Sequence, residues 1–336
     1  MKIKKINFKL ILCAVIAVSF FVSHNSASAL TISPARIEVS GDPGSIITKQ
    51  ITLLNDNKAG EETYYVTYSN FEAQGETGSP LFVEPKGDLG TWMNVGQSVT
   101  LKANESKTVI LTINIPKDAY PGGHFAVVFF GNNPSEGGQV TVGAKTGTLV
   151  LLSVNGDVLE AGGLSSFNTK NNKFFYNSLP VDFEYRWKND GNDRVKPEGD
   201  ITIRNLFYIR AARINANAVS GNILPHSTRL FNIEWLKNKI APEREGDTYL
   251  KSFMYHVSYQ WSNFAVGPYM AKLDLAFGNQ NTNHSSKNLF FFVFPWQLLV
   301  CITIFIIIIF FILKKVLKRY NKHIIEKARL GMKTPN

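Results

Sequence analysis

The amino-acid sequence predicts an all-β protein with two tandem β-sandwiches and one C-terminal transmembrane α-helix. Short runs rich in β-branched and aromatic residues alternate with turn residues at intervals typical of sandwiches, and apolar residues lie two apart within the runs. An apolar stretch over 289–313 carries no charged residue, which predicts a membrane span. We expect the first sandwich over 30–156 and the second over 157–288.

The net charge of +10 is concentrated at the two ends of the chain. Residues 1–29 carry four lysines and no acid, and 314–336 carry eight basic residues and one acid. Between them, 30–313 holds 24 basic and 25 acidic residues, so the predicted folded part is nearly neutral. This distribution excludes nucleic acid as the expected partner and indicates membrane topology instead.

The N-terminus reads as a signal peptide over 1–29. Basic residues in 2–9 precede an apolar run over 10–22, and Ala27 and Ala29 supply small residues for cleavage before Leu30. An uncleaved anchor is the alternative, but the apolar run is shorter than the roughly 20 residues that a spanning helix needs.

The second apolar stretch predicts the membrane anchor. A helix that begins at Pro295, where a missing N–H is harmless, and continues to Leu313 would span about 28 Å, close to the thickness of the hydrocarbon core. Trp296 would lie in the outer interface, and Lys314 and Lys315 end the apolar stretch.

The basic tail over 314–336 places this end in the cytoplasm by the positive-inside rule, and therefore places 30–288 outside the cell. The chain is thus predicted to be a single-pass protein of the cell membrane. The tail has two possible roles: a plain stop-transfer signal, or a short amphipathic helix that lies on anionic lipid, with apolar residues four apart. Those residues are Val316, Tyr320, Ile324 and Ala328.

In the first sandwich the apolar and β-branched runs predict strands over 32–39, 46–54, 63–71, 98–102, 108–115, 124–130 and 148–154. The residues Val109, Leu111, Ile113 and Ile115 lie two apart and should share the core face. In the second sandwich the same reading predicts strands over 181–188, 200–205, 228–235, 251–261 and 269–277.

The two halves share a weak repeat. An alternating strand that ends in Asn55-Asp56 has a counterpart that ends in Asn189-Asp190, and a polar turn opens a strand near Ser106 and again near Ser227. Aromatic residues of the second half leave two interpretations open, sugar-stacking platforms or core packing, of which packing is favoured. They include Tyr185, Trp187, Trp235, Tyr259 and Trp261.

Residues that carry chemistry are sparse. Both cysteines, Cys13 and Cys301, lie in apolar membrane-directed runs, and the six histidines have no metal-ligand spacing. The sequence contains no nucleophile elbow, phosphate-binding loop or dinucleotide-binding glycine pattern. We therefore predict no catalytic residue, no cofactor and no metal, and hence a protein that is not an enzyme. A cell-wall enzyme with paired carboxylates is the less favoured alternative.

This layout resembles the WxL-interacting surface proteins of Gram-positive bacteria, which combine a signal peptide, two immunoglobulin-like domains, one C-terminal helix and a lysine-rich tail. Local support comes from 44–55, 106–116 and the segment Pro121-Gly122-Gly123-His124-Phe125. The resemblance implies immunoglobulin-like sandwiches and a binding role.

The first domain is also similar to the N-terminal domain of periplasmic pilus chaperones, in 33–39 and 51–57. In that family an arginine of the first strand anchors the C-terminal carboxylate of a client, and Arg36 matches that position. The resemblance implies that Arg36 contacts a ligand. A solvated strand arginine is the alternative.

These observations predict a noncatalytic, membrane-anchored adhesion or scaffold protein whose partners are surface proteins or cell-wall glycan. The helix and the basic tail would contact membrane lipid. The alternative is a chaperone-like strand acceptor for surface proteins.

Overall fold

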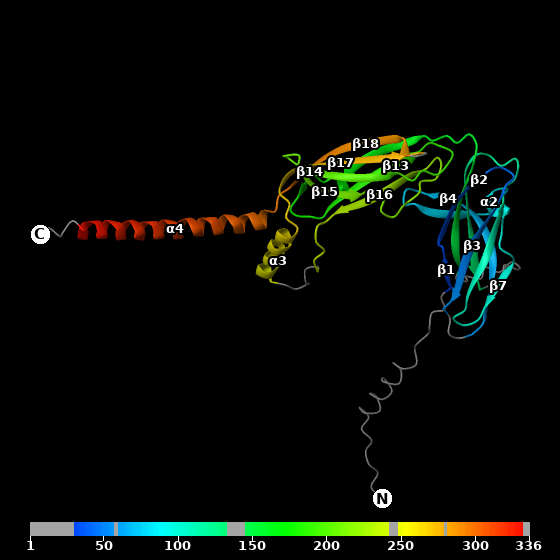
Figure 1. Ribbon diagram of the computed structural model, residues 1–336, viewed down its shortest axis with the longest axis horizontal. Helices are drawn as coiled ribbons and strands as arrows, with labels where there is room; N and C mark the ends of the chain where they lie inside the picture. Colours follow the sequence, from blue (N-terminus) through cyan, green and yellow to red (C-terminus); the bar gives the residue numbers. More distant parts are fainter. Residues whose placement is uncertain (1–29, 57–59, 133–144, 242–247, 279–280, 332–336) are drawn as a thin grey trace, which may run out of the picture. The chain divides into compact units, whose positions relative to one another are not determined.

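The computed structural model describes residues 30–56, 60–132, 145–241, 248–278 and 281–331. The expected signal peptide, with Ala27 and Ala29 of its cleavage site, lies outside the described residues, and Leu30 opens the first strand. Strands dominate the structure (Figure 1), and one long apolar helix ends it. The predicted fold class, immunoglobulin-like sandwiches followed by one C-terminal helix, is confirmed.

The chain forms two compact units. The first unit consists of the described parts of Met1–Gln74, Ser79–Leu159 and Gly191–Arg194. The second unit consists of Gly75–Gly78, Glu160–Asp190 and the described parts of Val195–Asn336.

The first unit is a sandwich of a four-stranded sheet, in the order β1-β3-β8-β6, and a six-stranded sheet, in the order β2-β10-β9-β4-β5 with β7 also beside β4. One short helix, α2, precedes β6. The elements are β1 (Leu30–Ser33), β2 (Arg36–Gly41), β3 (Ile46–Asn55), β4 (Glu62–Gln74), β5 (Ser79–Val83), α2 (Leu89–Trp92), β6 (Met93–Asn94), β7 (Ser98–Leu101), β8 (Ser106–Asn114), β9 (Gly122–Gly131) and β10 (Lys145–Val154).

Alternation along β8 builds the core of the first unit as the sequence predicts. Leu111 and Ile113 are buried, whereas Ile110 points away and is exposed. The expected single strand over 32–39 is wrong, because the chain changes sheets within it. Pro34 has no N–H to donate to a ladder, so β1 ends at Ser33 and β2 begins at Arg36 in the other sheet.

The second unit is a sandwich of a three-stranded sheet, in the order β11-β13-β16, and a five-stranded sheet, in the order β12-β18-β17-β14-β15. The short helix η1 follows β11, helix α3 lies between β16 and β17, and helix α4 follows β18. The elements are β11 (Gly162–Thr169), η1 (Lys170–Asn172), β12 (Phe175–Tyr176), β13 (Val181–Asn189), β14 (Glu198–Asn205), β15 (Arg210–Asn215), β16 (Thr228–Trp235), α3 (Tyr249–Ser262), β17 (Gly267–Phe277), β18 (Asn283–Val293) and α4 (Trp296–Gly331).

Aromatic side chains fill the core of the second unit. Tyr185 and Trp187 are fully buried, and the Tyr185 ring stacks on the Phe231 ring at 4.7 Å between centroids. The Trp187 ring meets the Phe277 ring edge-on at 4.9 Å. Core packing is therefore confirmed for these two residues, because a buried ring cannot stack on a sugar.

The predicted strand over 251–261 is wrong. Residues Tyr249–Ser262 form helix α3 instead, and the side chain of Trp261 is exposed. The alternation of aromatic residues in this run is compatible with a strand, but the segment packs beside α4 rather than in a sheet.

Helix α4 begins one residue after the expected Pro295 and continues through the basic tail to Gly331. Its most apolar window has a mean hydropathy of 2.9 and is little buried within the protein, so the helix is long and apolar enough to cross a membrane. The apolar stretch that begins at Leu289 is not all helix. Residues 289–293 are the end of β18, paired with β17, and this part of the predicted membrane segment is wrong.

Candidate binding face of the first unit

Strand β9 is apolar on both of its faces. Ala126, Val128 and Phe130 belong to the core between the two sheets. By alternation Phe125, Val127 and Phe129 point to the opposite, outer face of the six-stranded sheet. An antiparallel sheet on the surface of a sandwich ordinarily carries polar residues there, so an apolar outer face indicates a surface that meets another apolar group.

Neighbouring strands extend this outer face. Leu149 and Leu151 of β10 lie opposite Val127 and Phe125 in the strand register. The rings of Phe71 and Phe125 are 5.8 Å apart, the rings of Phe82 and Phe129 are 5.0 Å apart, and Phe71 faces Phe82 across β4 and β5. We define the outer apolar face by seven residues: Phe71, Phe82, Phe125, Val127, Phe129, Leu149 and Leu151.

Phe71, Phe125, Val127 and Leu151 of this face are buried within the structure, so the outer apolar face reaches solvent mainly at β5. Phe82 is 44% exposed, as is its neighbour Leu81, while Phe129 is half-buried. Strand β5 lies at the end of the six-stranded sheet and pairs with β4, and the described residues provide no strand for its other side. This edge therefore offers backbone hydrogen-bonding groups next to an exposed phenylalanine.

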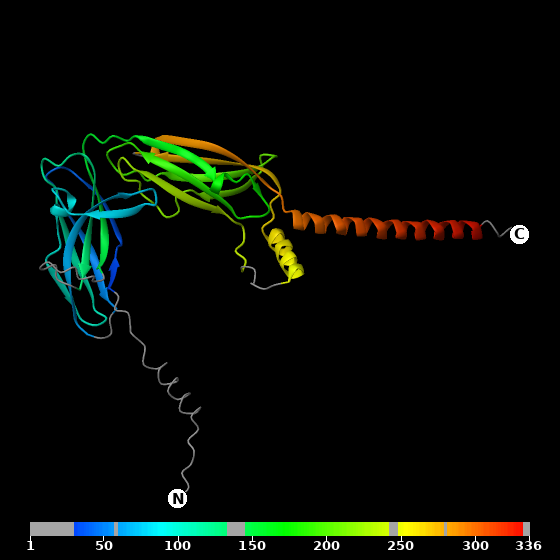
Figure 2. The same cartoon turned by 180° about the vertical axis from the view of Figure 1, so that it is seen from behind.

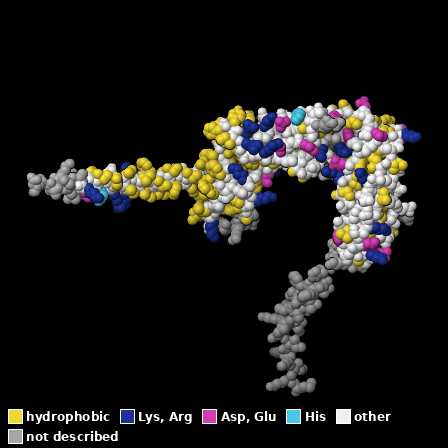
Figure 3. Space-filling view, in the orientation of Figure 1, with side chains coloured by type: hydrophobic (Ala, Val, Ile, Leu, Met, Phe, Trp, Pro, Cys, Tyr) yellow, Lys and Arg dark blue, Asp and Glu magenta, His cyan; other side chains and the backbone are white. Residues whose placement is uncertain are grey.

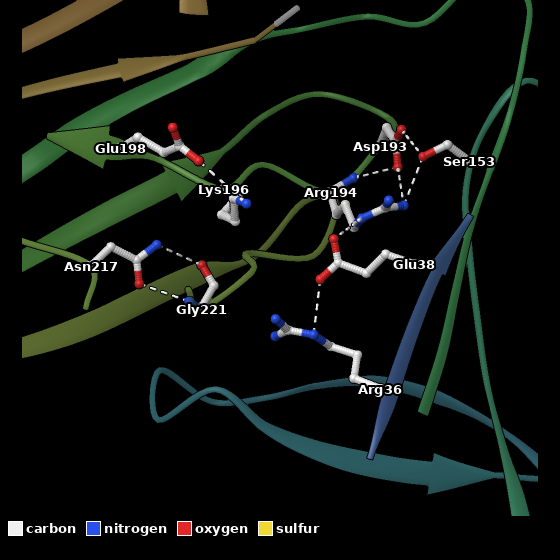
Figure 4. Close-up of polar contacts among 9 residues, drawn as sticks. All are labelled: Arg36, Glu38, Ser153, Asp193, Arg194, Lys196, Glu198, Asn217 and Gly221. Atoms are coloured by element: carbon white, nitrogen blue, oxygen red, sulfur yellow. Dashed lines mark hydrogen bonds and ion pairs between the residues drawn. The ribbon is translucent and has the colours of Figure 1, made fainter. Parts of the chain in front are cut away.

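Arg36 lies on the polar border of the same face. It pairs with Leu149, and Glu38 pairs with Leu151, so both side chains start from the outer side of β2. The Nε of Arg36 is 2.9 Å from one carboxylate oxygen of Glu38, and the other oxygen is 3.9 Å from the Nε of Arg194 (Figure 4). A ligand carboxylate would have to compete with Glu38 for the Arg36 guanidinium.

The Arg194 side of this border is closely hydrogen-bonded. The Nη1 of Arg194 donates to the Ser153 hydroxyl at 2.7 Å, and that hydroxyl donates to Asp193 at 2.5 Å. A carboxylate oxygen of Asp193 accepts from the backbone amide of Arg194 at 2.6 Å. Two arginines thus meet two carboxylates, so the border is balanced in charge and structurally fixed. Arg36 as a ligand contact stays a prediction.

His124 is the other titratable residue near β9, and its contacts are structural. Its Nδ1 lies 2.5 Å from the carboxylate of Asp88, and its Nε2 lies 2.8 Å from the backbone oxygen of Tyr120. Burial lowers the pKa of His124, but the hydrogen bonds to Asp88 and Tyr120 outweigh burial and raise the pKa above its ordinary value. The Trp92 ring covers the imidazole at 4.7 Å.

A cleft of about 630 Å³ lies in the second unit between η1, β12 and the two helices α3 and α4. Its lining is largely polar and includes Lys170, Lys173, His256, Gln260 and Gln297. Gln260 and Gln297 hydrogen-bond to each other. In the described part of the chain, no three His, Cys, Asp or Glu side chains group as metal ligands would.

Sequence reasoning singled out Arg36 but missed the outer apolar face. The signal was present in the unbroken run Phe125–Phe130, because six consecutive apolar residues in an antiparallel strand leave no polar side. It also missed β5, whose sequence Ser-Pro-Leu-Phe-Val is short and contains a proline.

Solved structures with some similarity to this chain include fimbrial chaperones. The class 5 fimbriae chaperone CfaA is 14% identical, with 78% of this chain and 99% of that chain covered and a TM-score of 0.37. A chain of the chaperone-tip adhesin complex of CFA/I fimbriae biogenesis is 13% identical, with coverages of 78% and 98% and a TM-score of 0.36. The E. coli chaperone DraB is 10% identical, with coverages of 78% and 97% and a TM-score of 0.31.

No family model matches the sequence, and no curated protein matches it. These three structures are fimbrial chaperones or part of a complex that contains one, the group that the sequence of the first domain resembles, and they do not bear on the WxL-interacting surface proteins. At these identities and TM-scores they assign neither a function nor a partner to this chain.

Proposed function

We propose that this chain is a noncatalytic, membrane-anchored protein that binds a partner polypeptide through the outer apolar face of its first unit. The observation that carries the proposal is the aromatic group on the outer side of β9, which continues to the exposed ring of Phe82 on an edge strand. Apolar rings that reach solvent at a sheet edge suit a polypeptide, whose side chains enter the face while its backbone meets the edge.

The candidate membrane span supports a topology for this proposal. Helix α4 is the candidate membrane span, and the basic residues that follow its apolar part favour a cytoplasmic C-terminus. Both sandwich units would then lie outside the cell, where the signal peptide would deliver them. Protease digestion of intact cells tests the topology: a tag after Asn336 should survive, whereas a tag inserted between Ala29 and Leu30, after the predicted cleavage site, should be removed.

Site-specific photo-crosslinking tests the binding face. A photoreactive phenylalanine analogue replaces Phe82 in the full chain, in its own cell envelope, and Ile110 is the matched control because it is an exposed apolar residue of the four-stranded sheet. We expect a discrete polypeptide adduct at position 82 and none at 110. Equal adducts at both positions, or glycan alone at position 82, would refute the proposal.

A chaperone-like strand acceptor is the second candidate, and the open side of β5 favours it. If a partner adds a strand there, backbone amides among Leu81, Phe82 and Val83 become protected from hydrogen exchange when the partner binds. If the partner only covers side chains of the face, mass spectrometry should find protection on β9 and little change on β5.

A further inference from the structure

Strand register brings four segments of the second unit to one end of its five-stranded sheet. Asn205 at the end of β14 lies opposite Tyr269, near the start of β17. Val293 at the end of β18 lies opposite Gly267, and α4 begins three residues later. The β14–β15 turn, α3, β12 and the start of α4 therefore gather at this end (Figures 1 and 2).

The turn between β14 and β15 presents four consecutive large apolar residues. Leu206, Phe207, Tyr208 and Ile209 are between 63% and 77% exposed. The conformation is fixed, because the side-chain oxygen of Asn205 accepts hydrogen bonds of 3.0 Å from the amides of Phe207 and Ile209. Turn tips in water are ordinarily polar or contain glycine, so an ordered tip of this composition indicates an apolar environment.

Helix α3 presents a second apolar surface at the same end. Leu250, Met254, Val257 and Trp261 follow the spacing i, i+4, i+7 and i+11, which places them on one narrow side of the helix. Leu250, Met254 and Trp261 are all more than half exposed.

This stripe is not the side that holds α3 in place. A neighbouring side of the helix, roughly a quarter turn away, packs on the start of α4, where the Phe253 ring contacts the Trp296 ring at 6.2 Å and Gln260 accepts from the amide of Leu298. Helix α3 is therefore fixed to the first turn of α4 with an apolar stripe facing outward.

Further apolar side chains connect these two surfaces to α4. Figure 3 shows hydrophobic side chains gathered at this end of the second unit and continuing along α4. The exposed ones outside the turn and α3 are Phe174, Phe175, Phe264, Val266, Phe290, Phe294 and Trp296.

We propose that this end of the second unit is a lipid-docking surface that lies in the outer interface of the membrane that α4 crosses. The proposal rests on the membrane span proposed above. The turn 206–209 and the outward stripe of α3 would enter the interface beside the first turn of α4.

Three observations favour lipid over a protein partner. The apolar surface is continuous with a helix whose own exposed side chains suit hydrocarbon. Tyrosine and tryptophan occur in it at Tyr208, Trp261 and Trp296, and these residues favour the level of the lipid headgroups. Exposed Arg204 and Arg210 flank the apolar turn, where basic side chains reach phosphate groups.

Depth-dependent quenching tests the proposal in the full chain, reconstituted in nanodiscs of phosphatidylglycerol and phosphatidylcholine. Cys13 and Cys301 are first replaced by serine, and single cysteines at Phe207 or Met254 then carry an environment-sensitive fluorophore. Val219 is the matched control, because it is apolar and 75% exposed. It lies in the loop after β15, near the pair of Asn215 and Asp200 at the other end of the five-stranded sheet. A label at Ile308 reports on the span itself.

We expect spin-labelled lipid to quench the labels at 207 and 254 at least about threefold more than the label at 219, as for groups at the lipid interface. If the label at 308 is quenched by deep spin labels while 207 and 254 match 219, the docking surface is wrong and the anchor stands. If 308 is not quenched, the anchor itself fails. A blue shift at 207 and 254 without lipid quenching would indicate a protein contact and overturn the proposal.

Discussion

The side-chain oxygen of Gln260 in α3 accepts a hydrogen bond of 2.9 Å from the backbone amide of Leu298, in the first turn of α4. Amides of a first helical turn have no carbonyl partner within their own helix, so Gln260 supplies one from a neighbouring helix. The amide group of Gln260 also donates to the backbone oxygen of Asn177 at 3.2 Å. One buried glutamine thus links α3, the start of α4 and the segment before β13.

Gln260→Leu should loosen this junction. The substitution keeps the size of the side chain but leaves the buried Leu298 amide without its partner, which costs about 1–3 kcal/mol. We expect faster hydrogen exchange in α3 and at the start of α4, measured by mass spectrometry on the chain in detergent. Ser258→Ala, on an exposed position of α3, is the control and should leave both segments unchanged. Unaltered exchange in Gln260→Leu would mean that the apolar contacts alone hold the helices together.

His124 should make the stability of the first unit depend on pH. Its pKa is raised above 6.5 in the folded protein, so the folded state binds the proton more tightly than the unfolded state does. The stabilisation is therefore complete below pH 6.5 and is lost as the pH rises through the raised pKa. Urea unfolding at a series of pH values, with hydrogen exchange of the β9 amides as the readout, should show this decline in the stability of the first unit. In His124→Gln the decline should be absent, and its persistence there would assign it to another group.

A buried asparagine occupies matching positions in the two units. Asn55 at the end of β3 donates to the backbone oxygen of Lys102 at 3.1 Å, and Asn189 at the end of β13 donates to that of Ile223 at 3.0 Å. The backbone N–H of Asn55 donates to the backbone oxygen of Glu105, and the backbone N–H of Asn189 donates to the backbone oxygen of Ser227. The structure therefore aligns Glu105 with Ser227, one residue away from the alignment that the sequence repeat suggests.

Each asparagine should stabilise its own unit. Asn55→Ala removes the donor to the backbone oxygens of Leu101 and Lys102, while the Tyr64 hydroxyl, which lies 3.1 Å from both the Asn55 side-chain oxygen and Glu62, keeps Glu62 as its acceptor. We expect a loss of about 2 kcal/mol. Asn189→Ala should cost a similar amount. Segment-resolved hydrogen exchange should place the first effect in β3, β4 and β7 and the second in β13 and β16. Effects that spread over both units in either variant would show that the units unfold together.

Strands β3 and β8 of the first unit were predictable because their side-chain alternation is set by one buried face. Helix α3 was not. Phe253, Tyr255 and Val257 alternate as in a strand, yet Leu250, Met254, Val257 and Trp261 fit a helix equally well. In a short run that satisfies both periods, the neighbouring structure decides, and here α4 provides a helical partner.

The start of helix α4 shows the same limit. Residues 289–293 and the helix after Pro295 form one apolar run in the sequence, but the first part pairs with β17 and the second leaves the sheet. Hydropathy measures only how apolar a segment is, and a buried strand and a membrane helix are both apolar. Pro295, which cannot donate a ladder hydrogen bond, was the sole local sign of the boundary.

Trp187 and Trp261 provide a test of core packing against surface exposure within one unit. Trp187 is fully buried against Phe277, so Trp187→Ala should destabilise the second unit by about 3–5 kcal/mol through the cavity that it leaves. Trp261 is 68% exposed, and Trp261→Ala should change stability by no more than about 0.5 kcal/mol in detergent. Urea unfolding, with hydrogen exchange of the β13 and β17 amides as the readout, measures the stability change in both variants. A large loss in Trp261→Ala would mean that this ring packs on the protein rather than facing outward, and the outward stripe of α3 would then lose its main residue.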